Sequence, residues 1–203
     1  MNKTYFITGI GTGIGKTIVS AILTEKLQAD YWKPIQSGDL DNSDSLLVAQ
    51  LISNKKTIIH PEQFKLSRPL SPHLSARIDG IQLTTAAIKA PATTNHLVIE
   101  GAGGLMVPIN EQELILDLIK SLNTKVIVVS QNYLGSINHT LLTLEVLKSK
   151  EIEVEGLIFN GPANEESERY ITMYSGVPTL GRIPQLENLD KENVQKAGDH
   201  LHF

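Results

Sequence analysis

The hydrophobic positions of this chain fall into short apolar runs separated by longer amphipathic stretches. The apolar runs occupy residues 5–8, 31–33, 97–100, 126–129, 157–159 and 179–180. Runs that are apolar throughout indicate strands buried on both faces of a sheet. Apolar residues recur at helical spacing within residues 18–27, 44–52, 114–122 and 137–150. This alternation predicts an α/β fold, a mostly parallel sheet flanked by helices on both faces.

The same pattern predicts a single domain over residues 1–203, because it shows no internal repeat, no low-complexity segment and no long linker. A chain of this length has room for a full hydrophobic core. From Leu186 onward the sequence is polar, which predicts either a partly disordered tail or a short helix.

Composition narrows the possible functions. The net charge is −4 and the basic residues do not cluster, so no nucleic-acid surface is expected. The absence of cysteine excludes disulfides, thiolate metal sites and a cysteine nucleophile. No apolar run approaches the roughly 18 residues of a membrane helix, and no signal layout precedes the first strand. We therefore expect a cytoplasmic protein without a membrane partner.

The strongest chemical motif is Gly9–Thr17, which reads Gly-Ile-Gly-Thr-Gly-Ile-Gly-Lys-Thr between the first predicted strand and helix. Glycines let successive backbone N–H groups turn toward a phosphate, and the helix start adds its positive dipole end. Lys16 supplies charge for the outer phosphates, and Thr17 is a magnesium ligand in such loops. The loop is one residue longer than the standard pattern, since Ile10 stands where the first glycine is expected. The motif predicts binding of a nucleoside triphosphate with magnesium.

Polar residues follow several predicted strands, and the carboxyl ends of parallel strands meet at one edge of a sheet. Glu100 ends one strand, and Asp44 begins a helix that Asn42 or Ser43 would cap. Both carboxylates suit magnesium, whereas Lys33 would neutralise charge that develops during phosphoryl transfer. For each residue alone, a solvated carboxylate or a surface lysine remains the alternative.

Two predicted helix starts carry weaker signals. Pro72 suits the first turn of a helix that Ser71 would cap. Bare N–H groups around Gly135–Asn138 would bind a carboxylate or phosphate, although a helix capped by Ser136 is the simpler interpretation. The histidines show no metal-ligand spacing, and a lone histidine such as His73 is interpreted as structural.

Taken together and in order, these segments resemble the dethiobiotin synthetase family. The resemblance covers nearly the whole chain through Gly9–Thr17 with its longer loop, Lys33–Gly38, Asn42–Asp44, Ser71–Leu74, Val98–Gly104, Leu134–His139, Asn160 and Gly181–Pro184. The glycine loop is shared by many proteins, and Glu100–Gly104 also occurs in related ATP-dependent synthetases. The segments that begin at Lys33 and Leu134 make the resemblance specific.

The resemblance implies the fold of a P-loop ATPase, a homodimer, and ATP and magnesium as cofactors. It also implies closure of a cyclic urea in biotin biosynthesis, in which 7,8-diaminopelargonate and carbon dioxide or bicarbonate give dethiobiotin. The reaction would pass through a carbamate and a carbamic–phosphoric anhydride. Such chemistry needs no protein nucleophile and depends on positioning and charge neutralisation.

The resemblance further assigns roles to individual residues. It implies catalytic roles for Thr12, Lys16 and Lys33, and magnesium ligation by Thr17, Asp44 and Glu100. It implies ATP contacts for Gly13, Ile14, Gly15, Lys16, Thr17, Ile18, Asn160 and Pro184. It implies substrate contacts for Ser37, Gly101, Gly104, Leu134, Gly135, Ser136 and Asn138, with the helix start at Gly135–Asn138 contributed across the dimer interface.

Three positions depart from the family pattern. Gly11 stands where the family commonly carries aspartate, and the segment around Ala29 and Asp30 is short. Glu187 is followed by Asn188, which displaces the acidic residue expected near the ribose. The ribose contact is therefore left unassigned.

Two other classes of P-loop protein are alternatives: an amidoligase synthetase, and a regulatory NTPase that acts as a switch and whose output is partner binding. An amidoligase synthetase that acts on corrinoid side chains usually carries a glutaminase domain with a nucleophilic cysteine, and this chain has neither. A guanine-specific switch would need an Asn-Lys-x-Asp element, which Asn123–Val126 does not supply. Membrane-partitioning ATPases carry a second lysine early in the loop, and Gly11–Gly13 contains none.

Overall fold

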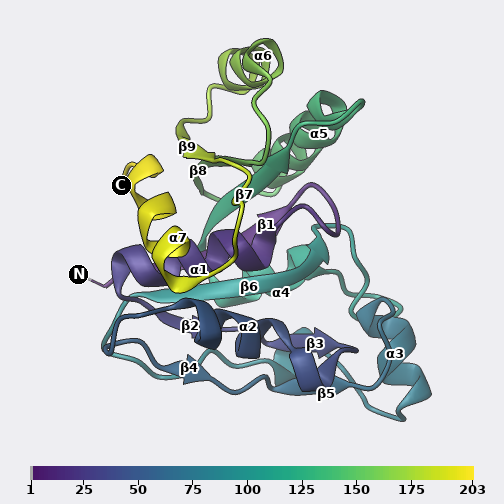
Figure 1. Ribbon diagram of the computed structural model, residues 1–203. Coiled ribbons are helices and arrows are strands. Elements are labelled where there is room, and N and C mark those ends of the chain that lie inside the picture. Colours follow the sequence, from purple (N-terminus) through teal and green to yellow (C-terminus); the bar gives the residue numbers. More distant parts are fainter. Residues whose placement is uncertain (1) are drawn as a thin grey trace.

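A computed structural model describes residues 2–203, and a seven-stranded sheet lies at its centre (Figure 1). The strands, in chain order, are β1 (Thr4–Gly9), β2 (Asp30–Trp32), β4 (Ile59–His60), β6 (Leu97–Gly104), β7 (Lys125–Gln131), β8 (Val154–Asn160) and β9 (Thr179–Ile183). Their spatial order is β4-β2-β6-β1-β7-β8-β9, and every neighbouring pair is parallel. The predicted parallel sheet is confirmed.

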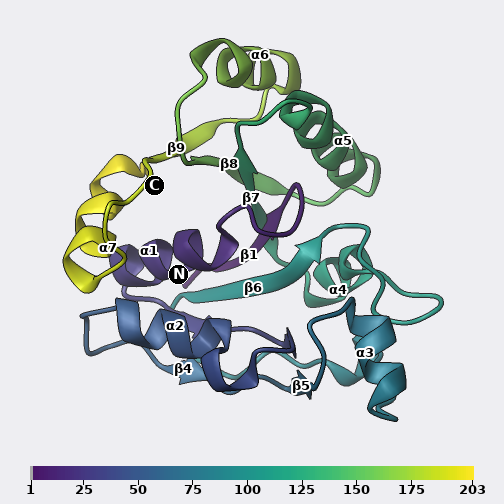
Figure 2. The same cartoon turned by 45° about the vertical axis from the view of Figure 1, so that its right-hand side comes forward.

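Helices cover both faces of this sheet, as Figures 1 and 2 show from two directions. One layer contains α1 (Lys16–Leu27), α2 (Asp44–Leu51) and α7 (Lys191–Ala197), which bury residues in one core cluster. The other layer contains α3 (Pro72–Ile78), α4 (Ile115–Leu122), α5 (Ser136–Ser149) and α6 (Glu165–Ser175), which bury residues in a second cluster. The predicted two-sided arrangement is also confirmed.

Alternation along the central strands explains why they are apolar throughout. Phe6 and Val126 belong to the core beneath α4 and α5, whereas Tyr5, Ile7 and Ile127 belong to the core beneath α1. Successive side chains of a strand point to opposite faces, so a sheet covered on both sides needs apolar residues at every position.

The smaller elements lie outside the sequence predictions. A separate parallel pair, β3 (Ile35–Ser37) with β5 (Phe64–Leu66), lies next to α3, and three 3₁₀ helices are present at η1 (Leu40–Asn42), η2 (Thr85–Ala87) and η3 (Gly198–His200). Strands of two or three residues are too short to show a period. The pattern also missed α6, because Ile171 is its one buried residue.

The polar tail contains a short helix, α7, so this alternative for residues after Leu186 is correct. After η3 the chain returns to β9, where Leu201 forms an antiparallel bridge with Gly181 and the His202 N–H donates to the Leu180 carbonyl at 2.8 Å. Gly181 has φ +141°, and a Cβ there would lie 2.0 Å from the His200 carbonyl oxygen. Only glycine allows the tail to approach so closely. Within residues 2–203, no helix is long and apolar enough to cross a membrane.

Candidate active site

The glycine loop connects β1 to α1 at the carboxyl end of the sheet. Gly13 and Gly15 both adopt positive φ angles, 73° and 88°. The Asn160 amide, at the end of β8, donates to the Ile14 carbonyl at 2.9 Å. A Cβ at Gly15 would lie 2.0 Å from the Asn160 amide nitrogen, so glycine is required here on both counts. Asn160 therefore supports the loop from the neighbouring strand.

Lys16 folds back into this loop, where its Nζ donates to the Gly11 carbonyl at 2.9 Å. Burial, aided by the nearby charge of Lys33, lowers the pKa of Lys16 to about 8, although the charges of Glu100 and Asp44 act to raise it. A buried lysine inside a glycine loop fits a multiply charged anion. Gly11 itself faces open space, since a Cβ there would have no neighbour within 4 Å.

The Thr17 hydroxyl meets two carboxylates from different elements. Its Oγ1 lies 3.0 Å from Asp44 Oδ1 and 2.8 Å from Glu100 Oε1. A hydroxyl has one proton, so it donates to only one of these oxygens at a time. The other carboxylate oxygen then lies close to the Thr17 oxygen without a shared proton, an arrangement that a bound cation would stabilise. A hydroxyl and two carboxylates are ligands that suit magnesium. Ser43 caps α2 by accepting from the Leu46 N–H, so Asp44 is left free for the site.

Lys33, just after β2, lies between the same carboxylates. Its Nζ pairs with Glu100 Oε1 at 3.1 Å and with Asp44 Oδ2. Burial acts to lower the pKa of Lys33, but the charges of Glu100 and Asp44 outweigh it, and the net shift is upward. Lys33 therefore stays charged at neutral pH.

The carboxylate set is incomplete as a metal site on its own. Among residues 2–203, no three His, Asp or Glu side chains gather closely enough to hold a metal ion. Thr17, Asp44 and Glu100 offer a hydroxyl and two carboxylates, and magnesium usually completes its shell with water and substrate phosphates. These residues thus fit a magnesium ion that arrives with a nucleotide.

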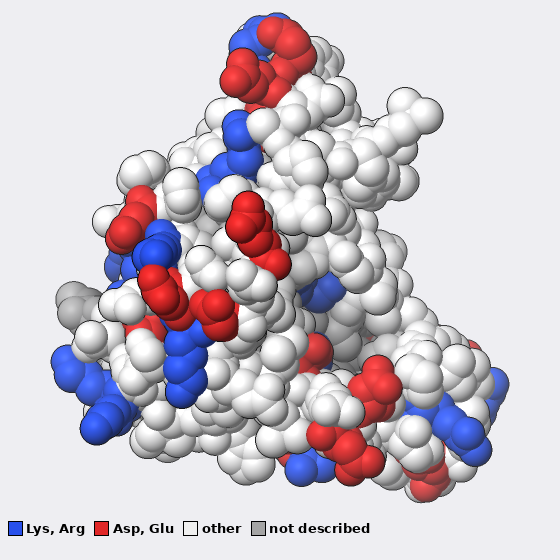
Figure 3. All heavy atoms as spheres, in the orientation of Figure 1, with Lys and Arg blue, Asp and Glu red and all other residues white. Residues whose placement is uncertain are grey.

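A cavity of about 600 Å³ opens beside Lys33; we call it the Lys33 cavity. Its lining includes Thr12, Lys33, Ser37, Asp44, Pro69, Ser71, Ala102, Gly103 and Val107. Figure 3 shows a hollow on the right-hand side of the molecule, between the positions of α5 and α3 in Figure 1. Charged side chains are visible in the depth of this hollow. The cavity brings Lys33 together with the hydroxyls of Thr12, Ser37 and Ser71 and with the Asp44 carboxylate.

Gly101 and Gly104 lie next to Ala102 and Gly103 in β6 but do not line the Lys33 cavity. A Cβ at Gly101 would lie 2.6 Å from the Phe6 ring, and one at Gly104 would lie 3.1 Å from the Gly9 carbonyl oxygen. The two glycines let β6 run close to β1 and the loop, and their contact with substrate stays a prediction.

A second cavity, of about 300 Å³, lies on the other side of the glycine loop; we call it the Pro184 cavity. It is lined by Ile18, Gln131, Asn160, Gly161, Pro162, Pro184, Gln185, Leu186 and Leu189. Three residues predicted to contact ATP, namely Ile18, Asn160 and Pro184, therefore come together here. The mixture of apolar walls and side-chain amides suits a nucleotide base.

The start of α5 forms a third feature, apart from the Lys33 cavity. Gly135, with φ +104°, occupies the cap position and no side chain caps the helix, so a Ser136 cap is wrong. Ser136 is the first helical residue and is buried. Leu134 is 104% exposed, and with Asn138 it lines a cavity that shares no residue with the Lys33 cavity. Likewise, Ser71 precedes α3 without a side-chain cap bond, whereas Pro72 lies in the first turn as predicted.

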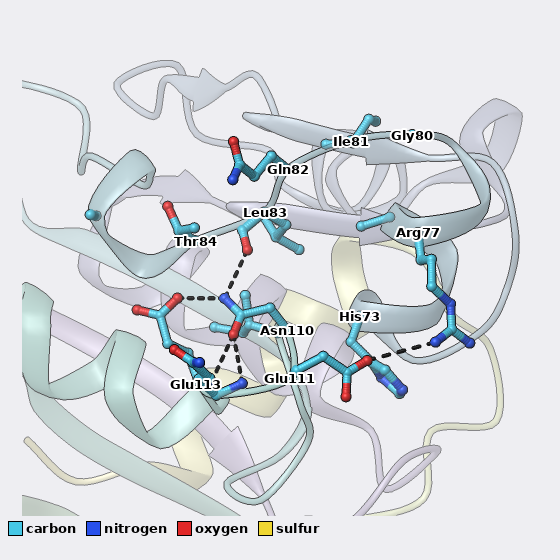
Figure 4. Close-up of a pocket in the computed structure, with 14 residues that line it drawn as sticks. His73, Arg77, Gly80, Ile81, Gln82, Leu83, Thr84, Asn110, Glu111 and Glu113 are labelled. Carbon is cyan, nitrogen blue, oxygen red and sulfur yellow. Dashed lines mark hydrogen bonds and ion pairs between the residues drawn. The ribbon is translucent and has the colours of Figure 1, made fainter.

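A further hollow between α3, η2 and the turn at 109–113 lies away from these residues (Figure 4). Asn110 donates to the Leu83 carbonyl at 2.9 Å and to Glu113, and Arg77 pairs with Glu111 at 3.6 Å. These polar groups bond with one another and do not converge on the space between them. We therefore place the candidate active site at the Lys33 cavity.

Comparison with known proteins identifies the family of the chain. Residues 3–193 match a family model described as an AAA domain. An ATP-dependent dethiobiotin synthetase from Christiangramia forsetii is 53% identical, over 98% of this chain and 96% of that protein. The chain belongs to the dethiobiotin synthetase family. A member of the family from Cytophaga hutchinsonii is 51% identical over 95% of this chain and 93% of its own length. The resemblance expected from the sequence motifs is confirmed.

Solved structures agree with this placement at the level of the fold. The septum site-determining protein MinD from Pyrococcus horikoshii, solved with Mg-ADP, aligns with a TM-score of 0.62 at 15% identity, over 97% of this chain and 86% of that chain. A ParA family ATPase from Chlorobium tepidum aligns with a TM-score of 0.54 at 14% identity, over 99% and 100% of the chains. This member of the dethiobiotin synthetase family therefore has the predicted P-loop fold.

The sequence analysis missed Tyr31, and it assigned no role to Gln131, which follows the predicted strand 126–129 at the edge where polar residues were expected to meet. Tyr31 donates its hydroxyl to Glu100 Oε2 at 2.8 Å, and Gln131 lines the Pro184 cavity next to Asn160. Tyr31 precedes Lys33 by two residues, a spacing that places both on one face of an extended segment. That spacing was the available signal for Tyr31, and the signal for Gln131 was its position at the end of a predicted strand.

Proposed function

We propose that this protein is a cyclo-ligase that closes a urea ring on 7,8-diaminopelargonate, in an ATP- and magnesium-dependent synthesis of dethiobiotin for biotin biosynthesis. One observation carries the proposal: in a chain 53% identical to a dethiobiotin synthetase, the buried Lys33 lines one cavity with Asp44 and with Thr12 of the glycine loop. Lys33 also pairs with the buried Glu100 carboxylate, which contacts Thr17 of the same loop. Phosphoryl transfer needs this combination of phosphate binding and charge neutralisation.

The reaction has three steps. One amine of the diamine adds to carbon dioxide and loses a proton, which gives a carbamate. A carbamate oxygen takes the γ-phosphoryl group of ATP, which releases ADP and leaves a carbamic–phosphoric anhydride. The second amine then attacks the carbonyl carbon and expels phosphate, so the ring closes with no covalent bond to the protein.

Each part of the site has a role in this sequence. Lys16 and the loop amides bind the phosphates, while Thr17, Asp44 and Glu100 hold magnesium, which when bound neutralises phosphate charge. Lys33 stabilises the negative charge that grows as the phosphoryl group moves to the carbamate. Among the residues assigned by the family resemblance, Thr12 and Ser37 line the space where the carbamate would lie, with Gly101 and Gly104 behind it. Asn160 and Pro184 hold the base.

We also propose a homodimer in which the α5 start of one copy reaches the Lys33 cavity of the other. The uncapped N–H groups after Gly135 suit the substrate carboxylate, and Ser136 and Asn138 belong to the same turn. The full exposure of Leu134 supports a partner at this place. Residues 1–203 then act as one domain, and we place the enzyme in the cytoplasm with its ATP supply.

The deciding experiment is phosphate release from MgATP and bicarbonate, with and without 7,8-diaminopelargonate, followed by mass detection of the product. We expect release that depends on the diamine and a product with the mass of dethiobiotin. Release that is indifferent to the diamine would instead favour a regulatory ATPase, and diamine-dependent release without dethiobiotin would favour another ligase reaction. Sedimentation of the same sample tests the dimer.

A further inference from the structure

Strand β2 and the segment after it present two hydrogen-bond donors to a single carboxylate. Tyr31 and Lys33 are two residues apart, so both side chains leave the same face of the extended chain. The Tyr31 hydroxyl lies 2.8 Å from Glu100 Oε2, and the Lys33 ammonium lies 3.1 Å from Glu100 Oε1. The parallel register, with Trp32 opposite Ile99, brings both donors level with Glu100.

The two oxygens of Glu100 have different partners. Oε1 faces the site, because Thr17 and Lys33 contact it. Oε2 points into the fold, where among residues 2–203 Tyr31 alone donates a hydrogen bond to it. A carboxylate held at its inner oxygen cannot turn about its terminal bond without breaking that contact, so Oε1 keeps one direction.

Tyr31 is well placed to hold this orientation. Its ring is fully buried in the core that also contains Ile7, Val48 and Val98. A tyrosine hydroxyl carries its proton at neutral pH, so Tyr31 can donate to this carboxylate. Without it, Glu100 Oε2 would be left without a partner beside apolar side chains, which is unfavourable for a charged group.

We propose that Tyr31 is a positioning residue that fixes the Glu100 carboxylate for magnesium. The proposal rests on the magnesium site of the proposed function, and it assigns to Tyr31 no contact with substrate or nucleotide. Partners that orient a metal-ligating carboxylate typically change metal affinity about 10–100-fold when they are removed.

The test compares two variants that each lose one hydroxyl hydrogen-bonded to a glutamate. Tyr31→Phe removes the contact with Glu100. Tyr5→Phe is the matched control, because Tyr5 is also buried and its hydroxyl donates to Glu155 at 3.2 Å near the amino end of the sheet. Free Mn²⁺ is followed by electron paramagnetic resonance during titration of each protein with ADP present, and ADP binding is measured separately in EDTA.

We expect Tyr31→Phe to weaken Mn²⁺ binding by about 10–100-fold, with ADP binding in EDTA unchanged, and Tyr5→Phe to bind both like the wild type. Unchanged ADP binding also shows that the variant is folded. Mn²⁺ affinity in Tyr31→Phe equal to that of the wild type would overturn the proposal, as would parallel losses of Mn²⁺ and metal-free ADP binding.

A double-mutant cycle tests whether Tyr31 acts through Glu100. In a Glu100→Gln background, Tyr31→Phe should produce no further loss of Mn²⁺ affinity, whereas two independent losses would contradict the mechanism. None of these measurements uses the diamine. Failure to make dethiobiotin would therefore overturn the proposed function alone, and metal-independent ADP binding by the wild type would overturn the magnesium site and the role of Tyr31.

Discussion

A buried carboxylate lies near each end of β2, Asp30 on β2 itself and Glu100 on the neighbouring β6, and the two differ in the donors that surround them. At the amino end, Asp30 accepts hydrogen bonds from the Thr93 hydroxyl, the Asn95 amide and the Ile58 N–H, with His60 also in contact. At the carboxyl end, Glu100 accepts from Thr17, Lys33 and Tyr31. Each acid is 1% exposed, so burial does not distinguish them.

The two carboxylates differ in whether an arriving cation could take the place of one of their hydrogen-bond donors. Neutral, fixed donors satisfy Asp30: burial acts to raise its pKa, but these hydrogen bonds outweigh it and the net shift is downward. Glu100 shares the single Thr17 proton with Asp44 and relies on the flexible ammonium of Lys33, which can move when a metal ion and phosphates arrive. The kind of donor, more than burial, separates a structural carboxylate from one that we propose binds a metal ion.

Removal of the charged donor should have the largest effect. Lys33→Ala is expected to lower kcat by about 10²–10³-fold with little change in ATP affinity, because the contact of Lys33 strengthens only as charge develops. Steady-state kinetics and ATP titration measure the two quantities. Lys125→Ala, which removes a lysine paired with Glu153 and Glu155 near the amino end, is the control and should keep full turnover. A parallel loss of ATP affinity in Lys33→Ala would contradict this role.

The opposite end of β2 should respond in stability instead. Asp30→Asn is expected to lower the free energy of unfolding by about 1–3 kcal/mol, since it places an amide among existing donors, and to leave kcat unchanged. Urea denaturation at pH 7 measures the loss. Because the folded pKa of Asp30 is depressed, its stabilising contribution is present above the unfolded pKa and is lost as pH falls through the folded value. A fall in kcat without a fall in stability would show that Asp30 has a functional role, and the proposed difference between Asp30 and Glu100 would be wrong.

The charge of Lys16 should make the ADP affinity of the carboxyl end depend on pH. Its pKa of about 8 means that Lys16 in the nucleotide-free site loses its positive charge above that pH, so the Kd for ADP in EDTA should rise about tenfold by pH 9. Isothermal titration at pH 7, 8 and 9 measures this, and Lys16→Met should bind weakly with a flat profile. The sign for stability is opposite: between pH about 8 and 10.5 the unfolded chain binds more protons at this lysine, so the Lys16 contribution to stability rises with pH.

A substitution at the start of α5 should have the smallest effect on the kinetics. Asn138→Ala is expected to raise the KM for the diamine by roughly 3–10-fold, the worth of about one hydrogen bond, and to leave the KM for ATP unchanged. Gln195→Ala removes an exposed amide from α7 and serves as the control. An effect of Asn138→Ala on ATP alone would remove the α5 start from the substrate site.

The sequence predicted the sheet well because its strands are buried on both faces, and such strands are recognisable as apolar runs. It also predicted that Lys33 and Glu100 would meet at the carboxyl edge of the sheet, where they form an ion pair. Asn160 lies at the same edge but lines the separate Pro184 cavity. The sequence did not predict the contact of Tyr31 with Glu100, because that contact depends on the register of β2 against β6, which apolar runs do not specify. The Ser136 cap was wrong because Gly135, in the left-handed region, takes the cap position.

The chain that returns along β9 has a consequence for solubility. β9 is an edge strand, and an open edge offers unpaired N–H and C=O groups to strands of other molecules. Here the His202 N–H occupies the Leu180 carbonyl, and Leu201 lies bridged to Gly181. At the far edge, β4 is only two residues long. The sheet thus offers few unpaired backbone groups at its edges. Residues 200–202 cover part of β9 and so hinder its pairing with a strand of another molecule.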